Sequence, residues 1–109
     1  ITDNSITGAA ADGIVCGAAC SVRGNSVESN NIGGIGTGGI VVADGSNVTG
    51  NSIGFNVGPG LSLPVTAGYS QNTFMLNAPD VLTVPPGPHP TSGFMNLCTG
   101  LVGPAPTCP

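Results

Sequence analysis

Few side chains in this 109-residue sequence could carry acid–base or metal chemistry. They are five acids, one arginine and one histidine: Asp3, Asp12, Glu28, Asp44, Asp80, Arg23 and His89. Eliminative cleavage of an acidic polysaccharide would need clustered acids to hold Ca²⁺ and a base to abstract a proton. Asp12 and Asp44 fall in different turns, the sequence has no lysine, and His89 stands in a run of prolines. We therefore predict no catalytic residue, no metal site and no cofactor.

Asparagine carries the clearest pattern. A short phrase of the form apolar–polar–x–Asn–Ser/Thr–apolar occurs at residues 1–6, 22–27, 48–53 and 69–74. Its asparagines are 21, 26 and 21 residues apart: Asn4, Asn25, Asn51 and Asn72. An amide side chain both donates and accepts, so stacked asparagines can bond from one coil to the next. We predict a structural asparagine ladder at a bend, and we expect Asn51→Ala to destabilise the fold more than Asn56→Ala.

A second apolar phrase lies between these copies. It is read at Ile14, Ile40, Leu61 and Leu82, with spacings of 26, 21 and 21 residues. Both series become regular if one five-residue insertion lies between Asn25 and Ile40, within segment 28–38. A fixed period near 21 indicates a repeat architecture, in which each unit stacks on its neighbours to bury its apolar face.

The repeated phrases are short, alternating and rich in β-branched residues, which is typical of strands. One set of positions expected to face the interior is Ile1, Val22, Val48 and Tyr69. A second set is Ile14 with Cys16, Ile40 with Val42, Leu61 with Leu63, and Leu82 with Val84. Units stacked at the spacing of hydrogen-bonded strands are expected to pair in parallel.

These in-register copies resemble the right-handed parallel β-helix repeat family, whose fold is shared with pectate-lyase-like proteins. The resemblance covers residues 1–84 and implies an all-β, right-handed parallel β-helix (a solenoid) of about four coils. Prolines in 85–90 lack the amide donor of a strand, so the coils are expected in 1–84 and a proline-rich C-terminal cap in 85–109. The last stretch, with Asn96, Cys98 and Cys108, is similar to the closing segment of secreted bacterial β-helix proteins. That similarity implies that Pro109 lies at or near the natural C-terminus.

Four cysteines favour disulfides over a metal site. Of the three possible pairings, the two local ones are the natural choice. Cys98–Cys108 would close a loop rich in glycine and proline and give the cap its disulfide. Cys16–Cys20 would span a Gly-Ala-Ala turn; the alternative is a buried Cys16 and a free Cys20 in the turn.

Charge is sparse and acidic. Charged residues make up 6% of the chain, and the net charge is −4 with one arginine. Such a surface has no cationic footprint, so nucleic acid and anionic membranes are not expected partners. No apolar run approaches the roughly 20 residues of a membrane span, so no membrane insertion is expected. The composition favours an extracellular or cell-surface location.

The fold class leaves the function open, because it hosts lyases, epimerases, hydrolases, adhesins and inert spacers. The first hypothesis is a non-catalytic structural module of a secreted protein, stacking into a fibre. The second is the C-terminal part of a carbohydrate-active enzyme of the lyase or epimerase type, with its site in preceding coils. The third is a module that binds carbohydrate through the insertion in 28–38. Ile1 opens in mid-phrase, so further coils or a neighbouring subunit are expected at that end.

Overall fold

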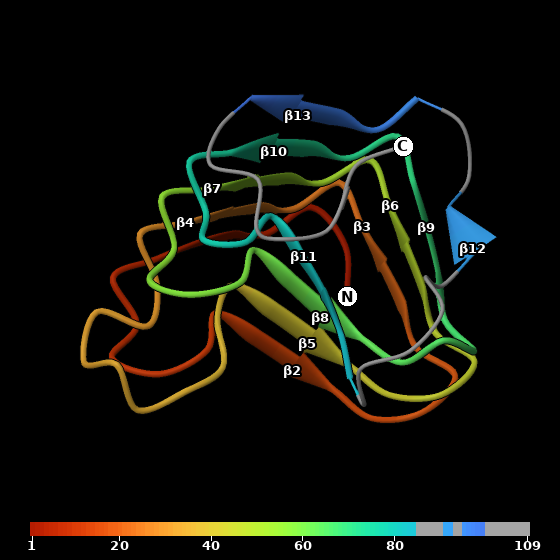
Figure 1. The fold of residues 1–109 in the computed structure, drawn as a ribbon, viewed down its shortest axis with the longest axis horizontal. Coiled ribbons are helices and arrows are strands. Elements are labelled where there is room, and N and C mark those ends of the chain that lie inside the picture. Colours follow the sequence, from red (N-terminus) through yellow and green to blue (C-terminus); the bar gives the residue numbers. More distant parts are fainter. Residues whose placement is uncertain (85–90, 93–94, 100–109) are drawn as a thin grey trace.

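The computed structural model describes residues 1–84, 91–92 and 95–99. The described residues contain no helix, and their strands form three parallel sheets (Figure 1). The prediction of an all-β chain with parallel pairing is therefore confirmed.

The strands are short and fall into three sheets. Sheet 1 contains β1 (Ser5–Thr7), β4 (Ser26–Glu28), β7 (Ser52–Gly54), β10 (Thr73–Met75) and β13 (Leu97–Thr99). Sheet 2 contains β2 (Ile14–Cys16), β5 (Ile40–Val42), β8 (Leu61–Leu63) and β11 (Val81–Thr83). Sheet 3 contains β3 (Ser21–Arg23), β6 (Asn47–Thr49), β9 (Gly68–Ser70) and β12 (Thr91–Ser92).

The chain visits the three sheets in turn, so each strand pairs with the third strand further along the chain. We call three consecutive strands and their turns one coil. In sheet 1 the register aligns Ser5 with Ser26, Ser26 with Ser52, and Ser52 with Thr73. These spacings are the 21, 26 and 21 residues of the sequence repeat, because each repeat forms one coil.

The alternation within each strand explains the core. A three-residue strand turns its middle or its outer residues inward, and the inward side chains of all three sheets form one apolar cluster. Its buried members are Ile14, Val22, Val27, Ile40, Val42, Val48, Ile53, Leu61, Leu63, Ala67, Tyr69, Phe74 and Val81. The two aromatic rings meet edge to face, with centroids 6.4 Å apart. β-branched residues supply most of the remaining volume, which suits a narrow interior between short strands.

Three positions that were predicted to face the interior are not buried: Ile1, Leu82 and Val84. In β11 the register pairs Val81 with Leu61 and Leu82 with Ser62, so Val81 is buried, Leu82 is half-buried and Val84 is exposed. The turn before β11 is one residue shorter than the turn before β8, which shifts the strand by one place and reverses its faces. Ile1 is 46% exposed because β3 covers it from one side only.

Parallel pairing continues beyond Val84. β12 adds to β9 in sheet 3, and β13 adds to β10 in sheet 1, both within the range that the sequence assigned to a cap. The proline run at 85–90 and the segment 100–109 lie outside the described residues.

Candidate functional site

The four predicted ladder asparagines lie in one column at the turn from sheet 3 to sheet 1. Asn4, Asn25 and Asn51 each use the backbone N–H and Nδ2 to donate to the Oδ1 of the asparagine one coil later, at 2.9–3.0 Å. Asn72 makes the same pair of bonds to Asn96, at 3.1 and 3.2 Å. Asn96 is thus a fifth member that the sequence repeat did not reveal, because the preceding coil is 24 residues long.

The amides in this column also hold the incoming strand. Asn51 Nδ2 donates to the carbonyl oxygens of Val22 and Thr49, at 3.0 and 3.2 Å. Its Oδ1 accepts from the backbone N–H and Nδ2 of Asn25. Each interior amide therefore fills its hydrogen-bonding capacity in a buried position, where an unpaired polar group would be costly.

A left-handed residue precedes every asparagine of this column. These residues have φ between 55° and 74°: Asp3, Gly24, Gly50, Gln71 and Met95. The left-handed residue turns the chain through the bend and directs the following amide into the column. Glycine adopts this conformation at little cost, which explains its presence before Asn25 and Asn51.

A second asparagine column, which the sequence analysis missed, lies at the turn from sheet 1 to sheet 2. Asn30 donates through its N–H and Nδ2 to Asn56 Oδ1, and Asn56 donates likewise to Asn77 Oδ1, at 2.9–3.2 Å. Ala9 occupies the first-coil position and donates only its backbone N–H, to Asn30 Oδ1. The available signal was a fixed offset, because Asn30, Asn56 and Asn77 each follow a first-column asparagine by five residues.

This second column corrects one expectation. Asn56 was expected to lie outside any ladder, but it is 4% exposed and makes ladder bonds on both sides. The expected ranking of Asn51→Ala above Asn56→Ala therefore has no structural basis.

Asp80 ends the second column. Its Oδ1 accepts from the backbone N–H of Asn77 at 3.3 Å and from Nδ2 at 3.1 Å. A carboxylate offers no N–H to a further coil, so it accepts the last donors without continuing the column. Asp80 is fully buried, and its Oδ2 has no hydrogen-bond partner among the described residues.

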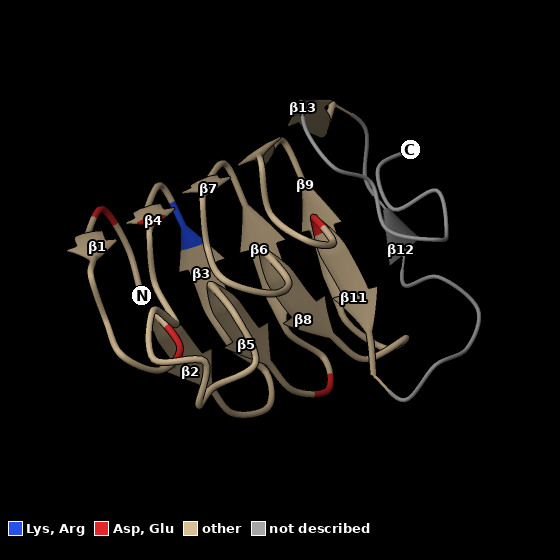
Figure 2. Cartoon of the chain, turned by 60° about the vertical axis from the view of Figure 1, so that its left-hand side comes forward, with Lys and Arg blue, Asp and Glu red and all other residues tan. Residues whose placement is uncertain are grey.

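The other acids lie apart and serve local structure (Figure 2). Asp12 Oδ1 accepts from the backbone N–H groups of Thr37 and Gly38, at 2.5 Å each. Asp44 accepts from the hydroxyl of Thr66 at 2.6 Å. Glu28 accepts from the Ser26 hydroxyl at 3.2 Å. No group of three or more His, Cys, Asp or Glu side chains that could hold a metal occurs within the described residues, and His89 lies outside them.

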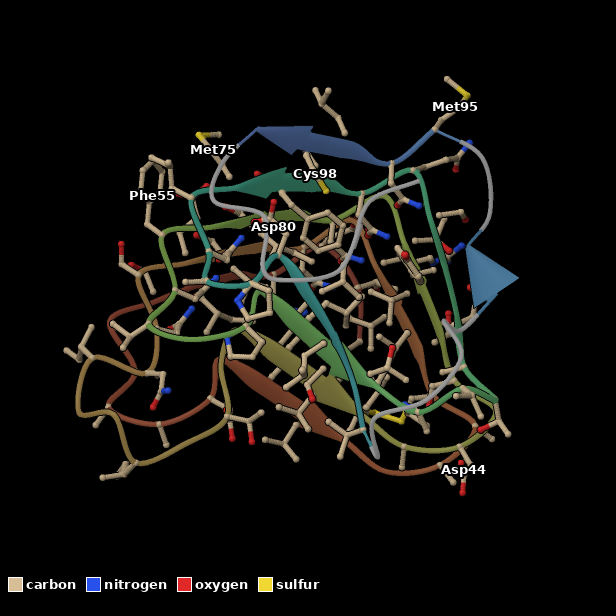
Figure 3. All side chains as sticks on the ribbon, viewed as in Figure 1. Asp44, Phe55, Met75, Asp80, Met95 and Cys98 are labelled. Carbon is tan, nitrogen blue, oxygen red and sulfur yellow. A yellow bond between two sulfur atoms is a disulfide. The ribbon has the colours of Figure 1, made fainter. Side chains whose placement is uncertain are left out.

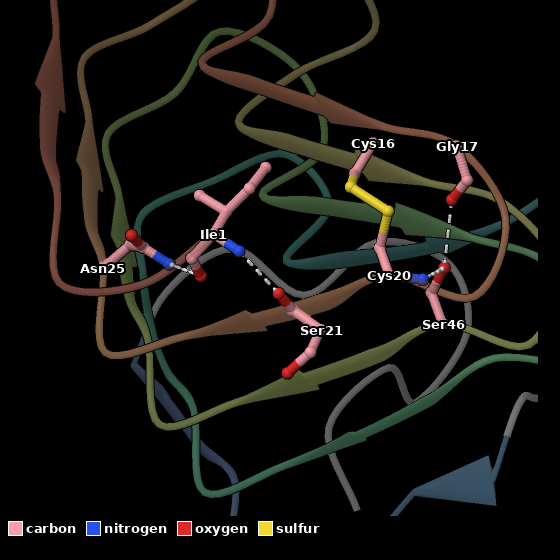
Figure 4. The surroundings of a disulfide bond; sticks show 7 residues. All are labelled: Ile1, Cys16, Gly17, Cys20, Ser21, Asn25 and Ser46. Carbon is pink, nitrogen blue, oxygen red and sulfur yellow. Dashed lines mark hydrogen bonds between the residues drawn. A yellow bond between two sulfur atoms is a disulfide. The ribbon is translucent and has the colours of Figure 1, made fainter.

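Cys16 and Cys20 form a disulfide across the turn that follows β2 (Figure 4). Ser46 of the next coil supports this turn, since its Oγ accepts from the Cys20 N–H at 3.1 Å and donates to Gly17 O at 3.2 Å. Cys98 lies in β13, but Cys108 is outside the described residues, so the Cys98–Cys108 pairing stays a prediction.

The insertion in 28–38 is a loop with its own hydrogen bonds. Asn31 Oδ1 accepts from Gly36 N–H at 2.8 Å, and its Nδ2 donates to Val57 O at 2.8 Å. Ile32 and Gly33 donate their backbone N–H groups to carbonyls of the first coil, at 3.1 and 3.0 Å. Together with the Asp12 contacts, these bonds fix the loop against the coils on both sides.

Comparison with protein-family models, with curated proteins and with solved structures found no match to this chain. Within the described part of the chain, no helix is long and apolar enough to cross a membrane. The features of this chain that bear on function are the two amide columns, the insertion loop and the sheet edges.

Proposed function

We propose that residues 1–84 form a right-handed parallel β-helix of about four coils, with a disulfide-bearing cap over 85–109. We further propose that it is a non-catalytic structural module at the C-terminal end of a secreted or cell-surface β-helix protein of the bacterial kind. The observation that carries this proposal is the pair of amide columns. In these columns, nearly all buried polar side chains at two bends form hydrogen bonds from one coil to the next.

The acids support the same reading. Asp12, Asp44 and Glu28 each accept a hydrogen bond from a neighbouring backbone or hydroxyl group, and Asp80 closes a column. Their engagement in turns and loops leaves them dispersed, whereas hydrolysis or elimination needs carboxylates gathered around one substrate bond. A disulfide at Cys16–Cys20 fits an oxidising compartment and so favours the secreted location.

The first coil is the proposed attachment surface. β1 and β2 are edge strands of sheets 1 and 2, and at the same edge of sheet 3 a single bridge joins Thr2 to Arg23 of β3. Asn4 Oδ1 accepts no hydrogen bond from the described residues, although every later first-column Oδ1 accepts two. Further coils of the same protein, or a neighbouring subunit, would supply the missing N–H and NH₂ donors and cover the strand edges.

The test adds one coil in front of the chain. A copy of residues 48–68 fused before Ile1 continues the repeat in register and places its first-column asparagine one coil before Asn4. If the first coil is a docking surface, the fused coil should fold onto it and raise the melting temperature, because solenoid stability grows with each interface. The matched control carries Asn51→Asp within the copied segment, which removes the amide donor while keeping the length.

An extended chain that melts no higher than the original, with the added segment cleaved rapidly by protease, would contradict the attachment surface. The non-catalytic assignment is tested separately, by incubating the chain with acidic and neutral polysaccharides. We expect neither unsaturated ends nor new reducing ends. Turnover would favour a carbohydrate-active enzyme, and binding without turnover would favour a polysaccharide-binding module.

A further inference from the structure

A cluster of exposed apolar side chains occupies the turn from sheet 1 to sheet 2, the bend that also holds the second amide column. We call it the apolar bend. Its side chains are 46–76% exposed: Ile32, Ile35, Phe55, Val57 and Leu76. They come from the insertion loop and from the two coils that follow it.

Backbone hydrogen bonds join the turns that carry the apolar bend. The sheet register pairs Gly54 with Met75, so Phe55 and Leu76 follow at equivalent places in adjacent coils, and Phe55 N–H donates to Met75 O at 2.8 Å. Figure 3 shows Phe55 on the outside of this turn, beside Met75. Val57 N–H donates to Asn30 O at 3.0 Å, which joins this pair to the start of the insertion loop.

Two members hold a strained conformation. Phe55 and Leu76 have φ of 55° and 53°, in the left-handed region that disfavours a bulky side chain. In the other column, glycine fills two of the equivalent positions. The turn into the second column requires a left-handed residue before Asn56 and Asn77, but it does not require a large apolar side chain exposed to solvent. Clustered side chains of that kind are typical of interaction surfaces.

The surface is also rigid before any contact. The bonds from Asp12 to Thr37 and Gly38, and from Asn31 to Gly36 and Val57, fix the loop that carries the two isoleucines. Binding through it would therefore require little ordering of the chain, which lowers the entropic cost of association.

The distribution of charged residues around the apolar bend favours a second copy of this chain as the partner. The segments 29–39, 55–60 and 76–79 contain no charged residue, and the exposed charges Asp3, Arg23 and Asp44 lie at the other two turns. Two half-buried acids border the apolar bend, and both already accept hydrogen bonds: Asp12 from Thr37 and Gly38, and Glu28 from Ser26. A polyanion would therefore meet no cation here. Two copies of this chain, each of net charge −4, can meet at this surface while these exposed carboxylates stay apart.

The exposed apolar area of the bend is also sufficient for a contact with a second copy. With about 100 Å² of apolar surface on each half-exposed large side chain, the patch offers on the order of 500 Å². Two such patches facing each other would bury about 1,000 Å², which is the size of weak, reversible interfaces. We therefore propose that the apolar bend is a two-fold contact between two copies of this chain, separate from the strand edges of the first coil.

Sedimentation velocity of the whole chain over a range of concentrations tests this inference. We expect a reversible dimer with a dissociation constant on the order of micromolar, little changed by added salt because the contact is apolar. The double variant Phe55→Asn/Leu76→Asn should weaken the dimer at least tenfold. Asparagine tolerates the left-handed conformation, so this variant should melt at the same or a higher temperature.

The matched control is Val15→Thr, which changes a 67% exposed apolar side chain on sheet 2, outside the apolar bend. It should leave the dissociation constant unchanged. A chain that stays monomeric at all concentrations would overturn the proposal, and so would a dimer that the double variant does not weaken. Association only with added phosphatidylcholine vesicles or polysaccharide would overturn it as well.

Discussion

Truncating one interior amide should reveal how much the columns contribute to stability. In Asn51→Ala the Oδ1 that accepts from Asn25 is lost, together with the Nδ2 that donates to Asn72, Val22 and Thr49. Five hydrogen bonds disappear, and the buried Asn25 N–H loses its acceptor. At about 1 kcal/mol per bond, with incomplete additivity, we expect a loss of about 3–4 kcal/mol in the free energy of unfolding.

Two further alanine variants provide reference values for this loss of stability. Asn56→Ala removes two accepted and two donated bonds in the second column, so its loss should fall within about 1 kcal/mol of that for Asn51→Ala. Asn4→Ala removes two donated bonds at an exposed position and no accepted bond, so it should cost less than about 1 kcal/mol.

The assay is equilibrium unfolding in urea, followed by far-ultraviolet circular dichroism, with thermal melts as a second measure. For a domain of this size, a loss of about 3 kcal/mol lowers the melting temperature by roughly 10–20 °C. The slope of the urea transition should be equal in all variants if only native contacts change. Equal losses for Asn4→Ala and Asn51→Ala would refute the reasoning, since bonding in the column would then add nothing. An Asn56→Ala variant as mild as Asn4→Ala would refute the second column.

Three other predictions follow from the turns. Gly50→Gln should lower the free energy of unfolding in urea by about 1 kcal/mol, and Gln71→Gly should raise it by up to about 1 kcal/mol. Both positions are left-handed, and a Cβ at Gly50 would meet open space, so backbone strain alone should set the effect. Effects of the opposite sign would show that side-chain contacts outweigh this strain. Ala9→Asn should extend the second column, raise the melting temperature and increase the free energy of unfolding by about 0.5–1 kcal/mol. An unchanged or lower melting temperature would mean that the first coil does not bind the added amide. Replacing Cys16 and Cys20 together by serine should lower the free energy of unfolding by about 2 kcal/mol, because the disulfide closes a short loop. Mass spectrometry of unreduced peptides should find both cysteine pairs oxidised. Free thiols at Cys98 and Cys108 would reject the second bridge.

The repeat was readable from the sequence because stacking imposes a constant number of residues per coil. The column Asn4, Asn25, Asn51 and Asn72 stands out since each asparagine is followed by serine or threonine and then by an apolar residue. The position of the insertion also followed from spacing alone. Parallel pairing followed from the same spacing, because units too small to bury their own apolar face must stack on copies of themselves. The strands themselves followed from the short, alternating phrases rich in β-branched residues.

Three features depended on contacts between coils: the second asparagine column, the register of β11 and the apolar bend. The second column has no constant flanking phrase, and Ala9 and Asp80 break it at its two ends. Its one sequence signal is the offset of five residues from the first column, and the hydrogen bonds of Asn30, Asn56 and Asn77 identified it as a column. The register of β11 likewise depended on a turn shortened by one residue, which local alternation cannot detect when Val81, Leu82 and Val84 are all apolar. The apolar bend joins residues up to 44 positions apart, because the winding of the chain brings the same turn of successive coils to one side.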